Sequence, residues 1–248
     1  MKTLFASFGW LLLLLPIVSV AGSRTILNAS GNNSGTEKRS VSNFTGISSS
    51  GAYDVFVKMG TTEDLRLEGD EDAIKNTETK VENGILKIRN IKSSGWNWTR
   101  EKVRIYISAK TLNTLSVSGS GDMEVNGVIK ATLLNTQVSG SGNIQLNVDA
   151  SNFNAAISGS GGINASGSAS VSNLAISGSG GFDGKNLKTD VTSVKVSGSG
   201  NATVSVEKEL NAKLSGSGNI RYTGNPKVNQ SKSGSGCVVR GCNLNCVK

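Results

Sequence analysis

The tetrapeptide Ser-Gly-Ser-Gly recurs along the second half of the chain, and this repeat constrains the fold more than any other feature. Its copies begin at Ser118, Ser139, Ser158, Ser177, Ser197, Ser215 and Ser233. Successive copies start 21, 19, 19, 20, 18 and 18 residues apart. This spacing is too regular for a linker and much longer than a coiled-coil or collagen period. The repeat therefore predicts a solenoid in which each rung contains one motif.

Aliphatic and polar residues alternate on both sides of each motif. Val194 and Val196 precede the fifth copy, for example, and Val204 follows it. A period of two is that of a β-strand that buries one face. The content of 31 Gly, 2 Pro and 5% aromatic residues also favours short strands and tight turns over helical bundles. We therefore predict an all-β fold, a parallel β-helix (β-solenoid) with rungs of about 18–21 residues.

The two glycines of each motif fall on the aliphatic side of the predicted strands, which suits a sharp corner where no Cβ atom fits. We predict structural turn glycines at Gly119, Gly121, Gly140, Gly142, Gly159, Gly161, Gly178, Gly180, Gly198, Gly200, Gly216 and Gly218. On this basis Gly200→Val should abolish cooperative unfolding, whereas Asp122→Asn should not.

The residue after each motif is Asp, Asn or Gly in six of the seven copies. These residue types tolerate a left-handed backbone best, so we expect this position to adopt the left-handed conformation of the corner. We also expect like residues of successive rungs to stack into Ser and Asn ladders.

The N-terminus has the pattern of a signal peptide. Lys2 precedes an apolar block that ends at Val18, and Ser19 and Ala21 are the small residues that signal peptidase accepts. The alternative is a spanning helix, but the block is shorter than the ~20 residues needed and contains Pro16. We assign residues 1–21 to the signal peptide. Residues 22–42, rich in Ser, Asn and Gly, are expected to form a flexible leader.

Residues 43–114 are expected to form atypical β rungs, because the terminal units of a solenoid cover an otherwise open edge. Residues 47–57 resemble one repeat in which the first glycine is replaced, and residues 70–76 fit one helical turn or a short loop. The repeat solenoid is assigned to residues 115–239, and a cysteine-containing tail to residues 240–248.

Three cysteines lie near the C-terminus: Cys237, Cys242 and Cys246. In an exported protein they meet an oxidising compartment, so we predict one disulfide among them, with one thiol left over. A zinc site would need a fourth ligand, and the chain contains no His. We interpret the disulfide as a staple that closes the end of the solenoid.

Charge and acid placement limit the function classes. Removal of Lys2 with the signal peptide changes the formal charge from +8 to +7, but no Lys/Arg run is longer than Lys38-Arg39, so we expect no nucleic-acid partner. The acids that follow the first motif do not recur at one repeat position, and no His is available as acid or base. Only Asp122 follows a motif as a carboxylate, which argues against a calcium array. We predict no catalytic residue, no metal and no cofactor.

Trp96 and Trp98 lie in a polar insertion and are the candidate recognition residues. Exposed paired Trp side chains would suit sugar stacking or a hot spot for a protein partner. The alternative is that both rings pack against the first rungs.

With these residues laid out, the chain resembles a bacterial envelope family, the putative auto-transporter adhesin, head GIN domain. The resemblance rests on the opening residues 47–55, the strand at residues 82–88, the serial Val-Ser-Gly-Ser-Gly units and the closing residues 220–226. It implies a right-handed parallel β-helix outside the cytoplasm, and the family offers no defined enzymatic site to transfer.

Together these observations predict a non-catalytic, adhesin-like binding or scaffold module with no transmembrane segment after signal cleavage. We expect it in the periplasm, on the outer surface or outside the cell, with an envelope glycan or another surface protein as partner. Two alternatives stay open: an envelope polysaccharide-active enzyme of the β-helix type, and a purely structural spacer.

Overall fold

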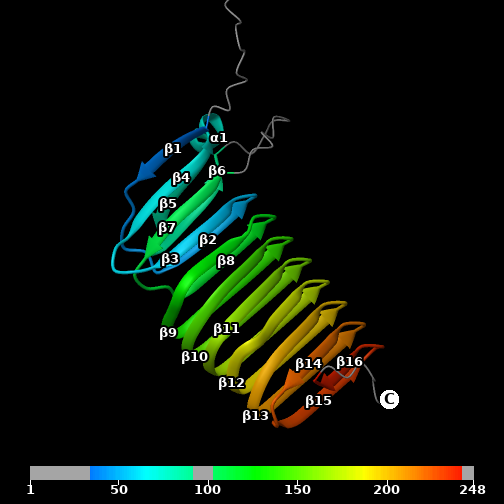
Figure 1. The fold of residues 1–248 in the computed structure, drawn as a ribbon. Coiled ribbons are helices and arrows are strands. Elements are labelled where there is room, and N and C mark those ends of the chain that lie inside the picture. Colours follow the sequence, from blue (N-terminus) through cyan, green and yellow to red (C-terminus); the bar gives the residue numbers. More distant parts are fainter. Residues whose placement is uncertain (1–33, 92–102, 242–248) are drawn as a thin grey trace, which may run out of the picture. The chain divides into compact units, whose positions relative to one another are not determined.

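The repeat region folds as a β-solenoid of about seven turns, in which the strands of successive rungs pair in parallel (Figure 1). The computed structural model describes residues 34–91 and 103–241. Of these described residues, 77% are strand and 3% are helix, which confirms the predicted all-β fold.

The N-terminal elements are β1 (Ser34–Arg39), β2 (Gly46–Gly51), β3 (Asp54–Met59), β4 (Asp64–Asp70), α1 (Glu71–Lys75), β5 (Thr77–Glu82), β6 (Ile85–Asn90), β7 (Arg104–Ala109) and β8 (Thr114–Gly119). The repeat elements are β9 (Met123–Gly140), β10 (Asn143–Gly159), β11 (Gly162–Gly178), β12 (Gly181–Gly198), β13 (Asn201–Gly216), β14 (Asn219–Thr223), β15 (Lys227–Ser233) and β16 (Cys237–Arg240). The helix α1 is short, and no helix within these described ranges is long and apolar enough to cross a membrane.

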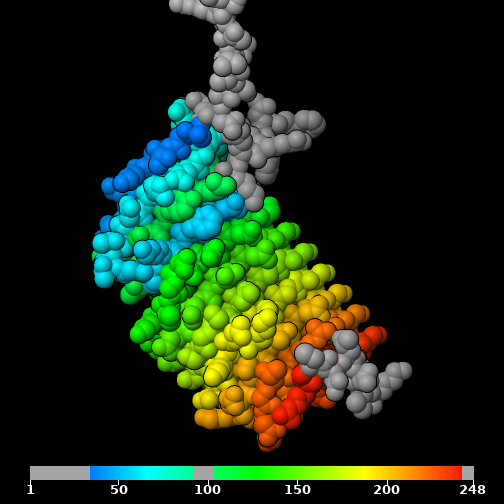
Figure 2. Space-filling model, in the orientation of Figure 1, coloured from blue at the N-terminus to red at the C-terminus, as the bar shows by residue number. Residues whose placement is uncertain are grey.

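Each long strand from β9 to β13 supplies two faces of the solenoid. In β10 the alternation of buried residues shifts between Ala150 and Phe153, both of which are buried, so the strand turns there through a second corner. We call the half that follows a Ser-Gly-Ser-Gly motif the first face, and the half that precedes the next motif the second face. Aliphatic side chains of both faces, such as Ile144 and Ile157, point inward and form one continuous core. Figure 2 shows the rungs packed without gaps on the face in view.

The Ser-Gly-Ser-Gly corners join each rung to the one before it. The carbonyl oxygen of Gly140 accepts hydrogen bonds from the backbone N–H groups of Ser160 and Gly161, each at 2.9 Å. The first glycine of each motif has a positive φ, 114° at Gly198. A Cβ atom on Gly200 would lie 2.6 Å from the carbonyl oxygen of Gly180. The corner therefore requires glycine because the backbones of neighbouring rungs touch there.

The expectation that the residue after each motif is left-handed is wrong. Among the described non-glycine residues, a positive φ occurs only at Asn43 and Asn83. The residue after the motif already lies at the start of the next strand, so its side chain stacks on the same position of the preceding rung. Asn143 donates to Asp122 Oδ1 from its backbone N at 3.0 Å and from Nδ2 at 2.9 Å.

The N-terminal rungs are not stacked in chain order. Strand β2 pairs in parallel with both β6 and β8, and β3 pairs in parallel with both β7 and β9. The β2–β3 rung thus lies between two rungs that come later in the sequence. Antiparallel strands cover the N-terminal end, since β4 pairs with β7, β5 pairs with β6 and β1 pairs with β4.

Two expectations for the N-terminal region need correction. Residues 34–39 of the expected leader form β1, because this segment pairs with β4 and the Arg39 side chain donates to the carbonyl oxygens of Thr77 and Ile74. In residues 47–57, the first glycine of the motif was expected to be replaced. The register aligns Gly51 with Gly119, so the first glycine is kept and Tyr53 replaces the second one. Of the two alternatives for residues 70–76, a helical turn and a short loop, the structure has the helical turn, as α1.

The C-terminal rung presents polar side chains at positions where earlier rungs have apolar ones. Gln230 aligns with Ala212, and Lys232 aligns with Leu214. Both polar side chains are exposed, whereas their partners in β13 are buried. A charged residue at a core position of an edge strand opposes the addition of a further strand. The end of the described solenoid is therefore protected against edge-to-edge association.

We predict that Gly200→Ala destabilises the fold by about 1–3 kcal/mol or more, because the new Cβ would overlap the backbone of the preceding rung. Gly181→Ala is the matched control, since its Cβ would meet only the Asn201 carbonyl oxygen at 3.9 Å. Its stability should stay within about 1 kcal/mol of wild type. Chemical denaturation measures both variants, and equal tolerance of the two changes would contradict the corner geometry.

We also predict that the double variant Gln230→Val/Lys232→Leu self-associates with rising protein concentration, because it extends two apolar columns to an edge strand. Ser231→Val, at an outward position of the same strand, should keep the oligomeric state of the wild type. Light scattering after size-exclusion chromatography compares the two. A double variant that is monomeric at every concentration would refute this role of the polar edge.

Candidate ligand-binding groove

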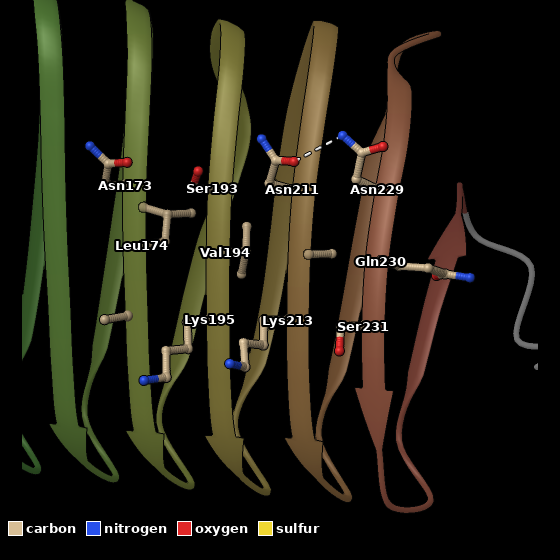
Figure 3. Close-up of a pocket in the computed structure, with 12 residues that line it drawn as sticks. Asn173, Leu174, Ser193, Val194, Lys195, Asn211, Lys213, Asn229, Gln230 and Ser231 are labelled. Carbon is tan, nitrogen blue, oxygen red and sulfur yellow. Dashed lines mark hydrogen bonds between the residues drawn. The ribbon is translucent and has the colours of Figure 1, made fainter.

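A groove of about 480 Å³ crosses the second face of the solenoid near its C-terminal end, over β11, β12, β13 and β15 (Figure 3). It runs along the stack, at right angles to the strands. Its lining residues are Asn173, Leu174, Ala175, Ser193, Val194, Lys195, Asn211, Ala212, Lys213, Asn229, Gln230 and Ser231. Leu174, Val194 and Ala212, which lie between the two walls, are buried, and the accessible lining of the groove is mostly apolar.

One wall of the groove is an asparagine ladder. Nδ2 of Asn173 donates to Oδ1 of Asn154 at 3.0 Å, and Nδ2 of Asn229 donates to Oδ1 of Asn211 at 3.0 Å. The ladder is interrupted at Ser193, which aligns with Asn173 on one side and with Asn211 on the other. Within the described residues, Asn173 Oδ1 and the Ser193 hydroxyl have no hydrogen-bond partner. The break therefore leaves an acceptor and a hydroxyl open to a ligand.

The opposite wall is formed by Ala175, Lys195, Lys213 and Ser231, which align across the four strands. Both lysines are exposed and extend in the same direction from neighbouring strands (Figure 3). No carboxylate lines the groove. This wall is cationic, and the arrangement suits an extended ligand that offers anionic and hydroxyl groups.

One carboxylate of the repeat region borders the groove, since Glu209 Oε1 accepts from Nδ2 of Asn211 and from Nδ2 of Asn229, each at 3.1 Å. Five other acidic residues of this region lie away from the groove. Glu124 and Asp183 share one column of the first face, but Gln145 and Asn164 separate them. Asp149 aligns with Lys130 and Ser168, Asp122 is stacked with Asn143, and Lys208 Nζ lies 3.0 Å from Asp190. No two of these five carboxylates face each other in the register, so the five do not supply the flanking pair that a glycosidase needs. Asp190 lies opposite the bulge of β13 at Glu207 and Lys208, and Lys208 forms the ion pair with it. Residues 34–91 and 103–241 also contain no cluster of three or more His, Cys, Asp or Glu that could hold a metal ion.

The structure places an aromatic stack on the first face that the sequence reasoning missed. The rings of Phe56 and Tyr106 stack at 5.3 Å between centroids, and the Arg66 guanidinium lies 4.5 Å from the Tyr106 centroid. The sequence does contain a pattern that indicates such a stack: an aromatic residue stands at an outward position between two inward aliphatic ones, as in Val55-Phe56-Val57. Each face of the Tyr106 ring is already covered, so the stack is a structural ladder and not an open sugar platform.

The predicted recognition and disulfide residues lie mostly beyond the described part of the chain. Trp96 and Trp98 fall outside it, as do Cys242 and Cys246. Cys237 is buried and disulfide-bonded. Which of the other cysteines pairs with it stays a prediction.

We predict that Ser193→Asn raises the free energy of unfolding by about 0.5–1 kcal/mol, because its amide would donate to Asn173 Oδ1 and continue the ladder. Ser193→Leu is the matched control, because its side chain has nearly the size and shape of Asn but neither a donor nor an acceptor. Urea denaturation should rank Ser193→Asn above wild type and above Ser193→Leu. The reverse order would contradict the ladder geometry.

Comparison with solved structures shows similar solenoids. A putative adhesin from Bacteroides fragilis NCTC 9343 is 22% identical, with a TM-score of 0.78 over 85% of this chain and 98% of its own. A putative lipid binding protein from Parabacteroides distasonis ATCC 8503 is 23% identical, with a TM-score of 0.68 over 84% of this chain and 97% of its own. A putative adhesin from Parabacteroides merdae ATCC 43184 is 22% identical, with a TM-score of 0.62 over 84% of this chain and 96% of its own. At these identities the likeness shows the fold alone.

No functionally curated protein matches the chain. A family model does match it, over residues 43–226, which cover the N-terminal rungs and most of the repeat solenoid. The chain therefore belongs to the family described as putative auto-transporter adhesin, head GIN domain.

Proposed function

We propose that this protein is an exported, non-catalytic, adhesin-like module of the cell envelope that binds a glycan in the groove of the second face. The groove carries the proposal, since it combines a polar ladder, a cationic wall and an open floor over four strands. Family membership and the adhesin descriptions of similar structures support a role at the envelope or surface.

The lining of the groove favours binding over catalysis. Hydrolysis of a glycosidic bond needs two carboxylates that flank the bond. No carboxylate is among the lining residues of the groove, and Glu209, which accepts from Asn211 and Asn229, is a single carboxylate at its border. The similar structure from Parabacteroides distasonis is described as lipid binding. The accessible surface of the present groove is mostly apolar, but most of the side chains in its walls end in amide, hydroxyl or ammonium groups. Such donors and acceptors match the hydroxyl groups of a sugar chain better than an acyl chain.

Export is supported by the sequence of residues 1–21, which has the pattern of a cleaved signal peptide. Periplasm, outer surface and extracellular space all agree with this pattern. The Trp96–Trp98 segment is proposed as a second recognition surface, because two Trp residues close together in a polar sequence suit sugar stacking.

Glycan-array binding and cell-wall pull-down test the proposal, with the full chain in the form that the cell exports. Ala175→Trp fills the groove at an exposed position of β11 and should abolish binding. Asn164→Trp adds the same bulk at an exposed position of the same strand on the first face, and should bind as wild type does. Circular dichroism checks that both variants fold.

The double variant Trp96→Ala/Trp98→Ala, run in parallel, separates the two surfaces. Binding lost only with Ala175→Trp assigns recognition to the groove, and binding lost only with the tryptophan variant assigns it to the 96–98 segment. No binding of the wild type to any glycan or cell wall would overturn the proposed function and favour a spacer.

A further inference from the structure

Two lysines face each other in the groove without a counter-ion. Lys195 and Lys213 are partners in the parallel register of β12 and β13, where neighbouring strands lie about 4.8 Å apart. Their outward neighbours are Ser193, Ser197, Asn211 and Ser215, all of which are neutral. Neither lysine forms an ion pair with another described residue. Like charges placed opposite each other destabilise a sheet, so this pair costs stability in the free protein.

The N-terminal end of the same face shows how the chain compensates such a pair. Lys80 and Lys87 also face each other, in the antiparallel register of β5 and β6. Glu82 lies between them, with one carboxylate oxygen 3.1 Å from Lys80 Nζ and the other 2.7 Å from Lys87 Nζ. Hydrogen bonds from Lys87 and Lys80 lower the pKa of Glu82 to about 2. A single carboxylate thus bridges facing lysines at one end of the solenoid, and none does so in the groove.

The break in the asparagine ladder lies directly beside the uncompensated lysines. Ser193 precedes Lys195 by two residues on β12, so both side chains point outward from the same strand. The free Oδ1 of Asn173 and the Ser193 hydroxyl face this position from the other wall. Two cationic groups, a free acceptor and a free hydroxyl therefore lie within one short stretch of the groove.

We propose that the groove binds a linear acidic polysaccharide, one carboxylate of which bridges Lys195 and Lys213 as Glu82 bridges Lys80 and Lys87. This inference rests on the proposed binding function and specifies its ligand class. The sugar hydroxyls bond to the free Oδ1 of Asn173 and to the Ser193 hydroxyl. The groove crosses successive strands, so the chain of the polysaccharide runs along the stack.

Isothermal titration calorimetry with an oligogalacturonate tests the inference, because this linear glycan carries one carboxylate on each residue. Wild type should bind it, and binding should weaken as salt is added. The fully methyl-esterified oligogalacturonate has the same backbone without charge and should bind much more weakly. Polyphosphate of similar charge serves as a second probe, since it lacks both carboxylates and sugar hydroxyls.

The test variant is Lys195→Gln/Lys213→Gln, whose Kd for oligogalacturonate should rise roughly tenfold to hundredfold. The charge-matched control is Lys58→Gln/Lys188→Gln, at exposed positions of the first face that form no ion pair among the described residues. The control should bind as wild type does. Ser193→Asn, which closes the ladder without changing the charge, should also weaken binding.

Equal losses in the two double variants would overturn the inference, because binding would then follow net charge alone. Equal affinity for polyphosphate and oligogalacturonate would overturn the assignment to a carboxylated glycan. Groove-dependent binding of neutral glycans, unaffected by Lys195→Gln/Lys213→Gln, would refute this inference and leave the proposed function standing. An absence of binding to every glycan would refute both.

Discussion

Backbone hydrogen bonds at the Ser-Gly-Ser-Gly corners hold each rung of this solenoid to the preceding one. The acceptor is the carbonyl oxygen of the first glycine in the motif of the preceding rung. In successive motifs that oxygen accepts backbone hydrogen bonds from the next rung, as Gly119 does from Ser141 and Gly142 at 2.8 and 3.0 Å. The contact is so close that a Cβ atom on Gly142 would lie 2.0 Å from the Gly121 carbonyl oxygen. The corner fixes the register, and the register then decides which side chains stack on which.

The fixed register explains why the outer surface consists of ladders. Residues at equal distances from the corner repeat along the stack, so each column has its own chemistry: asparagine and lysine beside the groove, and the Arg66–Tyr106–Phe56 stack on the first face. Where a column is continuous, its side chains satisfy one another. Where a column is broken, as at Ser193, or repeats a charge, as at Lys195 and Lys213, binding capacity remains.

The two ends of the solenoid stop the repeat by different means. At the N-terminal end, antiparallel strands and α1 cover the stack, and the Arg39 side chain ties β1 to α1 and to the start of β5. At the C-terminal end, Gln230 and Lys232 occupy core positions of the edge strand, and Cys237 is held by a disulfide. Both solutions protect an edge whose backbone groups would otherwise pair with another chain.

The sequence by itself determined the class of fold, the rung length and the position of the glycine corners, because period-two alternation and a recurring motif are local signals. It also indicated that ladders form. It did not show that β2 and β3 lie between later rungs, nor that Gly51 keeps the first corner glycine while Tyr53 replaces the second. The meeting of Lys195 with Lys213 beside a broken ladder was likewise decided by tertiary structure. Such pairings depend on the register between strands about 18 residues apart, and bulges shift that register by amounts that no local pattern reveals.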